Sequence, residues 1–125
     1  MSKTVLIVDD STSMRQMVSF TLKSAGFTVT EGANGKEALD KIASAAGGKF
    51  DLIITDLNMP VMDGLTFIKE ARAKPNMRFT PILMLTTENG DDRKALGKAA
   101  GATGWIVKPF QPEQLLKVVA KVVPS

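Results

Sequence analysis

Residues 5–10 read Val-Leu-Ile-Val-Asp-Asp, an apolar run that ends in two carboxylates. A polar group also ends the runs at 52–56 (Leu-Ile-Ile-Thr-Asp), 82–86 (Ile-Leu-Met-Leu-Thr) and 105–108 (Trp-Ile-Val-Lys). Short apolar runs rich in branched side chains are typical of strands buried on both faces of a parallel sheet. Ligands bind at the carboxyl edge of such sheets, so we expect three carboxylates, a hydroxyl and an ammonium group to converge there.

Helical patterns separate these runs, with apolar residues spaced three or four apart. The pattern predicts strands over 4–9, 27–31, 50–55, 81–86 and 103–107, and helices over 13–25, 35–46, 65–73, 91–100 and from 112 to before 124. Five βα units predict an α/β fold with a parallel five-stranded sheet. Because strands 1 and 3 both end in acidic residues, they should be neighbours, which favours the order 2-1-3-4-5 of the doubly wound, flavodoxin-like (βα)5 fold.

The first helix carries its own boundary signals. Ser11 or Ser13 is a candidate cap at its start, and Gly26 stands where a helix would end. Its apolar positions predict a buried face made of Met14, Met17, Val18, Leu22 and Ala25.

The length and composition limit the possible functions. The 125 residues fit one domain, 1–125, with no output domain expected after it. The chain has no cysteine and no histidine, which excludes disulfides, thiolate metal sites, Ser-His-Asp hydrolases and a phosphohistidine of its own. No secretory signal and no apolar stretch near the ~18 residues of a membrane helix is present. We therefore expect a cytoplasmic protein without a membrane partner.

The positive charge is concentrated near the C-terminus. The whole chain carries +3, whereas residues 93–125 hold six basic residues and one acidic residue, a net charge of +5. This segment lacks an arginine cluster and an aromatic stacking platform, so we expect no nucleic-acid binding. A solvated helical face and a dock for an acidic partner both remain open at this point.

The carboxylates suggest a cation site. A lone Asp-Asp after a strand is commonly a cap or turn, but Asp9, Asp10 and Asp56 together would repel one another. A divalent cation resolves that repulsion, and Mg²⁺ prefers oxygen ligands while keeping several waters. We expect Asp10, Asp56 and the backbone carbonyl of Asn58 to bind the metal directly. Asp9 would act through a water molecule or through Lys108.

The same edge has the groups needed to receive phosphate. Asp56 is the candidate nucleophile, because a carboxylate can accept a phosphoryl group as an acyl phosphate. Lys108 could turn over the carboxylates and pair with the phosphate, and the Thr86 hydroxyl could donate to a phosphoryl oxygen. Each residue alone has an ordinary structural explanation: a strand-end aspartate, a solvated lysine and a branched strand residue.

Taken together, these motifs resemble the response-regulator receiver domain, over residues 3–122. The resemblance rests on the following residues, in family order: Asp9-Asp10, Asp56, Asn58-Met59-Pro60, Gly64, Thr86 and Lys108-Pro109-Phe110. The run at 101–110 is most similar to the stand-alone chemotaxis regulators of that family. Leu57 stands where those regulators carry tryptophan, and Trp105 where many relatives have tyrosine or phenylalanine.

The resemblance implies a phosphorylation switch. A sensor histidine kinase of the chemotaxis type would pass its phosphoryl group to Asp56 with Mg²⁺, for which Mn²⁺ can substitute. Thr86 would then bond the phosphoryl group, and the aromatic ring at Trp105 would turn inward. Asn58 and Glu88 occupy the positions that influence how long the phosphorylated state lasts. Such a protein is no enzyme beyond its own phosphorylation and dephosphorylation.

The resemblance also implies the partners. The +5 segment coincides with the face that family members use for output, so we expect a downstream target with an acidic surface, for which a flagellar switch protein is a candidate. A phosphatase is a further candidate partner. The expected partner face comprises Lys94, Lys98, Trp105, Lys117 and Lys121. Apolar residues of the last helix read as core, so we expect a monomer.

Three other functions share features of this sequence. A single-domain phosphorelay intermediate shares every motif and stays open. A haloacid-dehalogenase-type phosphatase needs a second aspartate two residues after the nucleophile, where this chain has Asn58. A flavodoxin-type FMN carrier needs a Ser/Thr/Gly-rich phosphate loop, and the residues at 9–12 are too acidic for one.

Overall fold

The computed structural model describes residues 3–44, 50–56, 62–74, 77–86, 91–108 and 110–123. Strands and helices alternate along this part of the chain. The strands are β1 (Thr4–Val8), β2 (Thr28–Gly32), β3 (Leu52–Asp56), β4 (Ile82–Thr86) and β5 (Gly104–Val107). The helices are α1 (Thr12–Ser24), α2 (Gly35–Ser44), α3 (Gly64–Arg72), α4 (Asp91–Ala100) and α5 (Pro112–Val122). The predicted α/β alternation is confirmed.

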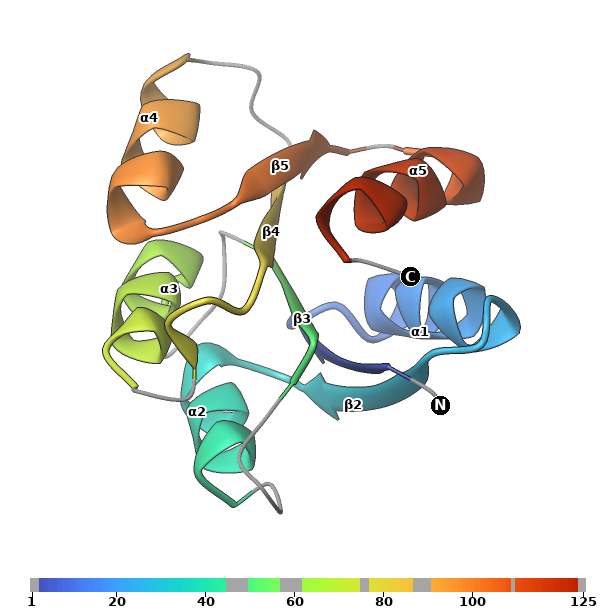
Figure 1. Ribbon diagram of the computed structural model, residues 1–125, viewed down its shortest axis with the longest axis horizontal. Helices are drawn as coiled ribbons and strands as arrows, with labels where there is room; N and C mark the ends of the chain where they lie inside the picture. The colour runs from blue at the N-terminus through green and yellow to red at the C-terminus, as the bar shows by residue number, and fades with distance from the viewer. Residues whose placement is uncertain are drawn as a thin grey trace.

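The strands form one parallel sheet in the order β2-β1-β3-β4-β5. Helices α1 and α5 cover one face of this sheet, and α2, α3 and α4 cover the other (Figure 1). The predicted strand order is therefore confirmed, and with it the doubly wound architecture, in which both faces of the sheet are buried.

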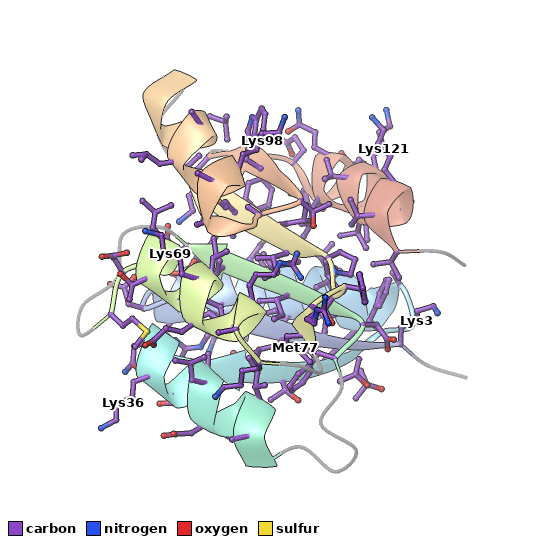
Figure 2. All side chains as sticks on the ribbon, turned by 60° about the vertical axis from the view of Figure 1, so that its left-hand side comes forward. Lys3, Lys36, Lys69, Met77, Lys98 and Lys121 are labelled. Carbon is purple, nitrogen blue, oxygen red and sulfur yellow. The ribbon has the colours of Figure 1, made fainter. Side chains whose placement is uncertain are left out.

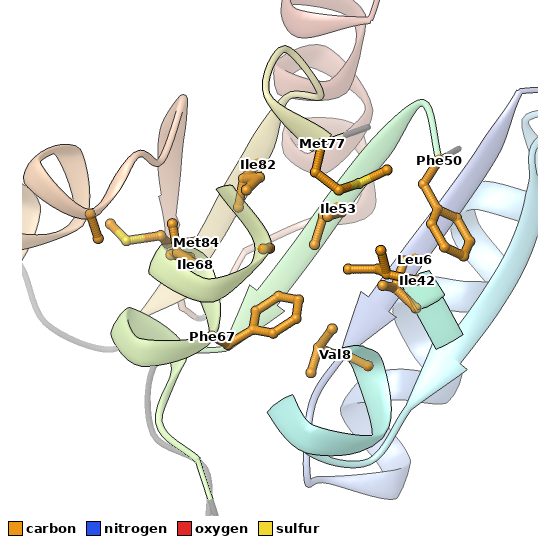
Figure 3. Close-up of a cluster of buried hydrophobic side chains, with 13 residues drawn as sticks. Leu6, Val8, Ile42, Phe50, Ile53, Phe67, Ile68, Met77, Ile82 and Met84 are labelled. Carbon is orange, nitrogen blue, oxygen red and sulfur yellow. The ribbon is translucent and has the colours of Figure 1, made fainter. Parts of the chain in front are cut away.

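Alternate residues of each strand feed two separate cores. Leu6 and Val8 of β1 belong to the cluster beneath α2 and α3, whereas Val5 and Ile7 belong to the cluster beneath α1 and α5. In the first cluster, the ring of Phe67 on α3 lies among the side chains of the sheet and α2 (Figure 3). This period of two explains why the strands read as continuous apolar runs.

The first helix begins and ends at recognisable capping residues. The Ser11 hydroxyl accepts a hydrogen bond from the Met14 N–H at 3.3 Å, so Ser11, and not Ser13, is the N-cap of α1. Gly26 has a φ of +98°, in the left-handed region, and its N–H donates to the Lys23 carbonyl at 3.0 Å. The prediction that Ala25 lies on the buried face is wrong: Ala25 is the exposed residue at which the helix unwinds toward Gly26.

Among the described residues, no helix has the length and apolar character needed to cross a membrane.

Candidate functional site

The polar residues at the strand ends lie along one edge of the sheet. In the parallel β1–β3 pair, Val8 at the end of β1 is in register with Thr55 of β3. Asp9 and Asp56 are the next residues along the two segments. On the other side, the Lys108 N–H donates to the Thr86 carbonyl at 2.7 Å and extends the β4–β5 ladder past the end of β5. The structure thus brings together side chains that are far apart in the sequence.

Three carboxylates meet at this edge. Asp9, Asp10 and Asp56 each place an oxygen within 4.8 Å of the oxygens of the other two. Asp9 is fully buried and Asp56 is 7% exposed, whereas Asp10 faces solvent. Three carboxylates, one of them exposed to solvent, match the preference of Mg²⁺ for oxygen ligands and for a coordination shell that keeps several waters. The donor set therefore fits a hard divalent cation.

Lys108 lies over two of these carboxylates. Its Nζ is 3.3 Å from Asp56 Oδ2 and 3.7 Å from Asp9 Oδ2. The ammonium group balances one of the three negative charges, which leaves two for a divalent cation to neutralise. The lysine side chain is 14% exposed, so the pair is only weakly screened by water and salt.

Asp9 is the most deeply buried of the three carboxylates. Its Oδ1 accepts the Ser11 N–H at 2.9 Å, but its buried Oδ2 accepts no hydrogen bond from the described residues. Burial raises the pKa of Asp9 above its usual value, and the nearby Asp56 and Asp10 carboxylates add to the rise. The Ser11 N–H and Lys108 oppose it. An unsatisfied buried carboxylate oxygen beside other carboxylates is an arrangement that a bound cation would relieve.

This environment predicts that Asp9→Asn stabilises the metal-free protein. Because the pKa of Asp9 is raised in the folded state, Asp9 binds its proton at a higher pH in the folded protein than in the unfolded one. Ionised Asp9 therefore lowers the free energy of unfolding at neutral pH. This loss is absent at low pH, where Asp9 is protonated in both states, and it develops as the pH rises through the folded pKa. An asparagine amide would instead donate to the neighbouring carboxylates. In EDTA at neutral pH, urea unfolding should show a gain of about 1 kcal/mol in the free energy of unfolding.

The gain from Asp9→Asn should disappear as the pH falls below the ordinary range of aspartate titration. The exposed residue Asp40 on α2 is the matched control, and Asp40→Asn should leave the free energy of unfolding nearly unchanged. A loss of stability in Asp9→Asn at neutral pH would contradict this description of the site.

The structure describes only some of the remaining predicted site residues. Thr86 is the last residue of β4 and is 1% exposed. Asn58, Glu88 and Pro109 lie outside the described residues, so the predictions that depend on them stay predictions.

The predicted partner face lies over α4, β5 and α5. Trp105 is half-buried, packs against the core and pairs in register with Met84 of β4. Lys98, Lys117 and Lys121 are exposed, and Lys98 on α4 and Lys121 on α5 project from the same side of the molecule in Figure 2. The side chain of Lys94 lies outside the described residues. These three exposed lysines contribute positive charge to the surfaces of α4 and α5.

Two residues that were not predicted from the sequence, Arg15 and Glu31, support the turn that carries Asp9 and Asp10. Arg15 on α1 donates from Nη1 to the backbone carbonyl of Asp9 at 2.7 Å, and from Nε to Glu31 Oε1 on β2 at 3.1 Å. A lone arginine in the first turns of a helix gives no signal of such a contact, because the contact joins three segments that only the fold brings together.

Comparisons with known proteins identify the family. Residues 5–120 match the family described as the response regulator receiver domain. The chemotaxis protein CheY1 of Helicobacter pylori strain J99 is 42% identical over 120 residues, which cover 95% of this chain and 94% of that protein. The structure of the chemotaxis response regulator CheY4 of Vibrio cholerae is 54% identical with a TM-score of 0.93, over 98% of this chain and all of that one.

A more distant structure bears on the cation. The receiver domain of a sensor histidine kinase from Pseudomonas aeruginosa, solved with a magnesium ion coordinated in its active-site cleft, is 28% identical with a TM-score of 0.88. The two chains cover each other completely. From its fold, its strand-end carboxylates and its match over nearly the whole sequence, this chain belongs to the response regulator receiver domain family of two-component signalling.

Proposed function

We propose that this protein is a phosphorylation switch in which Asp56 accepts a phosphoryl group from the phosphohistidine of a sensor histidine kinase. The observation that carries the proposal is the position of Asp56, within 4.8 Å of the Asp9 and Asp10 oxygens and 3.3 Å from the Lys108 ammonium. A carboxylate beside both a cation site and a fixed positive charge suits attack on a phosphoryl group.

Asp10, Asp56 and the backbone carbonyl of Asn58 would hold the cation directly, and Asp9 would hold it through water. The unsatisfied Oδ2 of Asp9 and the cluster of carboxylates support this assignment. Bound Mg²⁺, or Mn²⁺ in its place, supplies positive charge that neutralises the oxygens of the phosphoryl group in transfer.

The protein's own residues carry out the other parts of the phosphoryl transfer. An Asp56 carboxylate oxygen attacks phosphorus, an O–P bond forms, and the P–N bond to the donor imidazole breaks with its electron pair going to the ring nitrogen. Lys108 pairs with a phosphoryl oxygen, and the Thr86 hydroxyl donates to another. Water later hydrolyses the acyl phosphate, and Asn58 and Glu88 influence the rate. The protein catalyses no reaction other than its own phosphorylation and dephosphorylation.

The output would be a change in the face formed by α4, β5 and α5. When Thr86 moves toward the phosphoryl group, Trp105 would turn inward and alter the surface that carries Lys94, Lys98, Lys117 and Lys121. Positively charged residues steer an acidic partner to this face. The similarity to CheY proteins supports a role in chemotaxis, with a CheA-like kinase, a target such as a flagellar switch protein, and a phosphatase as partners of a cytoplasmic monomer.

Trp105 offers a test of the switch, because it is the only tryptophan and the chain has no tyrosine. Phosphoramidate carries a P–N bond like that of phosphohistidine. With Mg²⁺, this donor should change the Trp105 emission of the wild type and leave Thr86→Ala nearly unchanged, since the hydroxyl that links the phosphoryl group to the aromatic ring is lost. Thr66→Ala, on exposed α3 surface, is the matched control.

An equal emission change in Thr86→Ala and the wild type, with equal phosphorylation by intact mass, would contradict the proposed link between Thr86 and Trp105. No emission change in a phosphorylated wild type would contradict the proposed movement of Trp105.

A further inference from the structure

Arg15 connects the cation site to the edge of the sheet. Its guanidinium Nη1 donates to the Asp9 carbonyl at 2.7 Å, and its Nε pairs with Glu31 at 3.1 Å. The Arg15 side chain is 18% exposed and that of Glu31 is 37% exposed. The two contacts brace the turn between β1 and α1 against β2, which lies at the edge of the sheet with β1 as its neighbour.

The bonded carbonyl is well placed to orient Asp10. It belongs to the peptide group that joins Asp9 to Asp10, and because a peptide group is planar, fixing its oxygen restricts ψ of Asp9 and φ of Asp10 together. The other hydrogen bonds of this turn hold Asp9 from its own side: the Asp9 N–H donates to the Gly32 carbonyl at 3.1 Å, and the Ser11 N–H donates to Asp9 Oδ1 at 2.9 Å.

The direction in which the Asp10 carboxylate points depends on the backbone conformation of Asp10. Within the described part of the chain, neither a hydrogen bond nor an ion pair holds the Asp10 carboxylate, which is exposed at the open side of the cluster. Asp9 and Asp56, in contrast, are buried and lie beside Lys108. The side chain with the fewest restraints is thus attached to the peptide group that Arg15 holds.

Glu31 makes this brace compatible with a cation. A guanidinium group near a Mg²⁺ site repels the metal, and the paired carboxylate of Glu31 offsets that charge. The pair also limits the rotamers of Arg15, so that the bond to the Asp9 carbonyl costs less entropy.

We infer that Arg15, braced by Glu31, is a positioning residue that orients the Asp9–Asp10 peptide group so that the Asp10 carboxylate faces the divalent cation. The inference rests on the proposed function, since it assumes that Asp10 binds the metal. It gives Arg15 no contact with the metal or with the phosphoryl group.

The Mg²⁺ affinity of Arg15 variants distinguishes a positioning role of Arg15 from a direct effect of its positive charge. Removing a positive charge near a cation site should by itself tighten Mg²⁺ binding, whereas losing the brace should weaken it. We expect Arg15→Met to raise the Mg²⁺ dissociation constant about tenfold, as loss of an outer-shell partner does at other metal sites. Calorimetric titration of the metal-free protein with MgCl₂ gives the constant without any phosphoryl transfer, and Arg15→Lys, which can still donate to the carbonyl, should recover part of the affinity.

Lys23→Met is the matched control, because Lys23 is an exposed basic residue on the same helix. It removes the same charge without touching the turn, and its dissociation constant should stay within about twofold of the wild type. The double variant Arg15→Met/Glu31→Gln removes both charges of the pair, so the net charge near the site is unchanged and only the brace is lost. Its Mg²⁺ dissociation constant should therefore still exceed that of the wild type.

A second readout reports the brace in the absence of metal. The ¹⁵N amide shift of Asp10 senses the hydrogen bond to the preceding carbonyl, so it should move in metal-free Arg15→Met and stay in place in Lys23→Met. If Arg15→Met binds Mg²⁺ as tightly as the wild type or more tightly, the positioning role is wrong while the proposed function stands. If the wild type itself binds no Mg²⁺ at millimolar concentrations, the proposed function fails and this inference fails with it.

Discussion

Asp56→Asn is expected to take up no phosphoryl group under conditions in which the wild type takes up one. Asp56 is the last residue of β3, buried beside Lys108. An amide at this position is a poor nucleophile and cannot form an acyl phosphate. It also removes one of the carboxylates that would hold the cation. Intact mass after incubation with acetyl phosphate and Mg²⁺ measures the result as the presence or absence of one phosphoryl adduct.

Two controls sharpen this experiment. Asp40→Asn, an exposed aspartate on α2, should gain the adduct like the wild type, and the wild type in EDTA should gain none. Equal phosphorylation of Asp56→Asn and the wild type would mean that another residue is the acceptor.

Lys108→Met is expected to destabilise the metal-free protein strongly. The ammonium group lies 3.3 Å from Asp56 and 3.7 Å from Asp9, and all three side chains are largely buried. Removing one partner of a buried charge cluster leaves the remaining charges uncompensated, which typically costs about 3 kcal/mol or more. Urea unfolding in EDTA at neutral pH should show that loss, and saturating Mg²⁺ should recover much of it by supplying the missing positive charge.

The same substitution should tighten Mg²⁺ binding, because the site then carries three uncompensated carboxylates instead of two. Lys117→Met, on exposed α5 surface, is the matched control and should alter neither quantity. In the double variant Lys108→Met/Asp56→Asn, the destabilisation should be smaller than in Lys108→Met alone. If Lys108→Met is as stable as the wild type in EDTA, Lys108 does not compensate the carboxylates as the geometry suggests.

Much of the fold could be predicted from the sequence because local patterns and tertiary structure agree. Each apolar run follows the period of two that feeds both cores, as Leu6 and Ile7 do on β1. Caps and turn residues mark the helix ends, as Ser11 and Gly26 do for α1. Ala25 was misassigned because helical spacing continues past the point where the backbone unwinds.

The candidate site was predictable for a different reason. Parallel strands place their carboxyl ends at one edge, so the strand order puts Asp9 and Asp56 at the ends of neighbouring strands. Lys108 follows β5, beyond β4, and its long side chain reaches both carboxylates. The Arg15 brace was not predictable, because its two partners lie in a turn and on β2, and no local rule specifies where a long side chain will donate. The assignments to Asn58, Glu88 and Lys94 stay predictions, since those groups lie outside the described residues.

The central claim, that Asp56 is the phosphorylated residue, is tested most directly by chemical trapping. Sodium borohydride reduces an acyl phosphate to an alcohol and leaves free carboxylates intact, so a phosphorylated aspartate becomes homoserine. After incubation with acetyl phosphate and Mg²⁺, borohydride treatment and digestion, tandem mass spectrometry should find homoserine at position 56 and aspartate at positions 9 and 10. Homoserine at another position, or none in a protein that carries the phosphoryl adduct, would contradict the account.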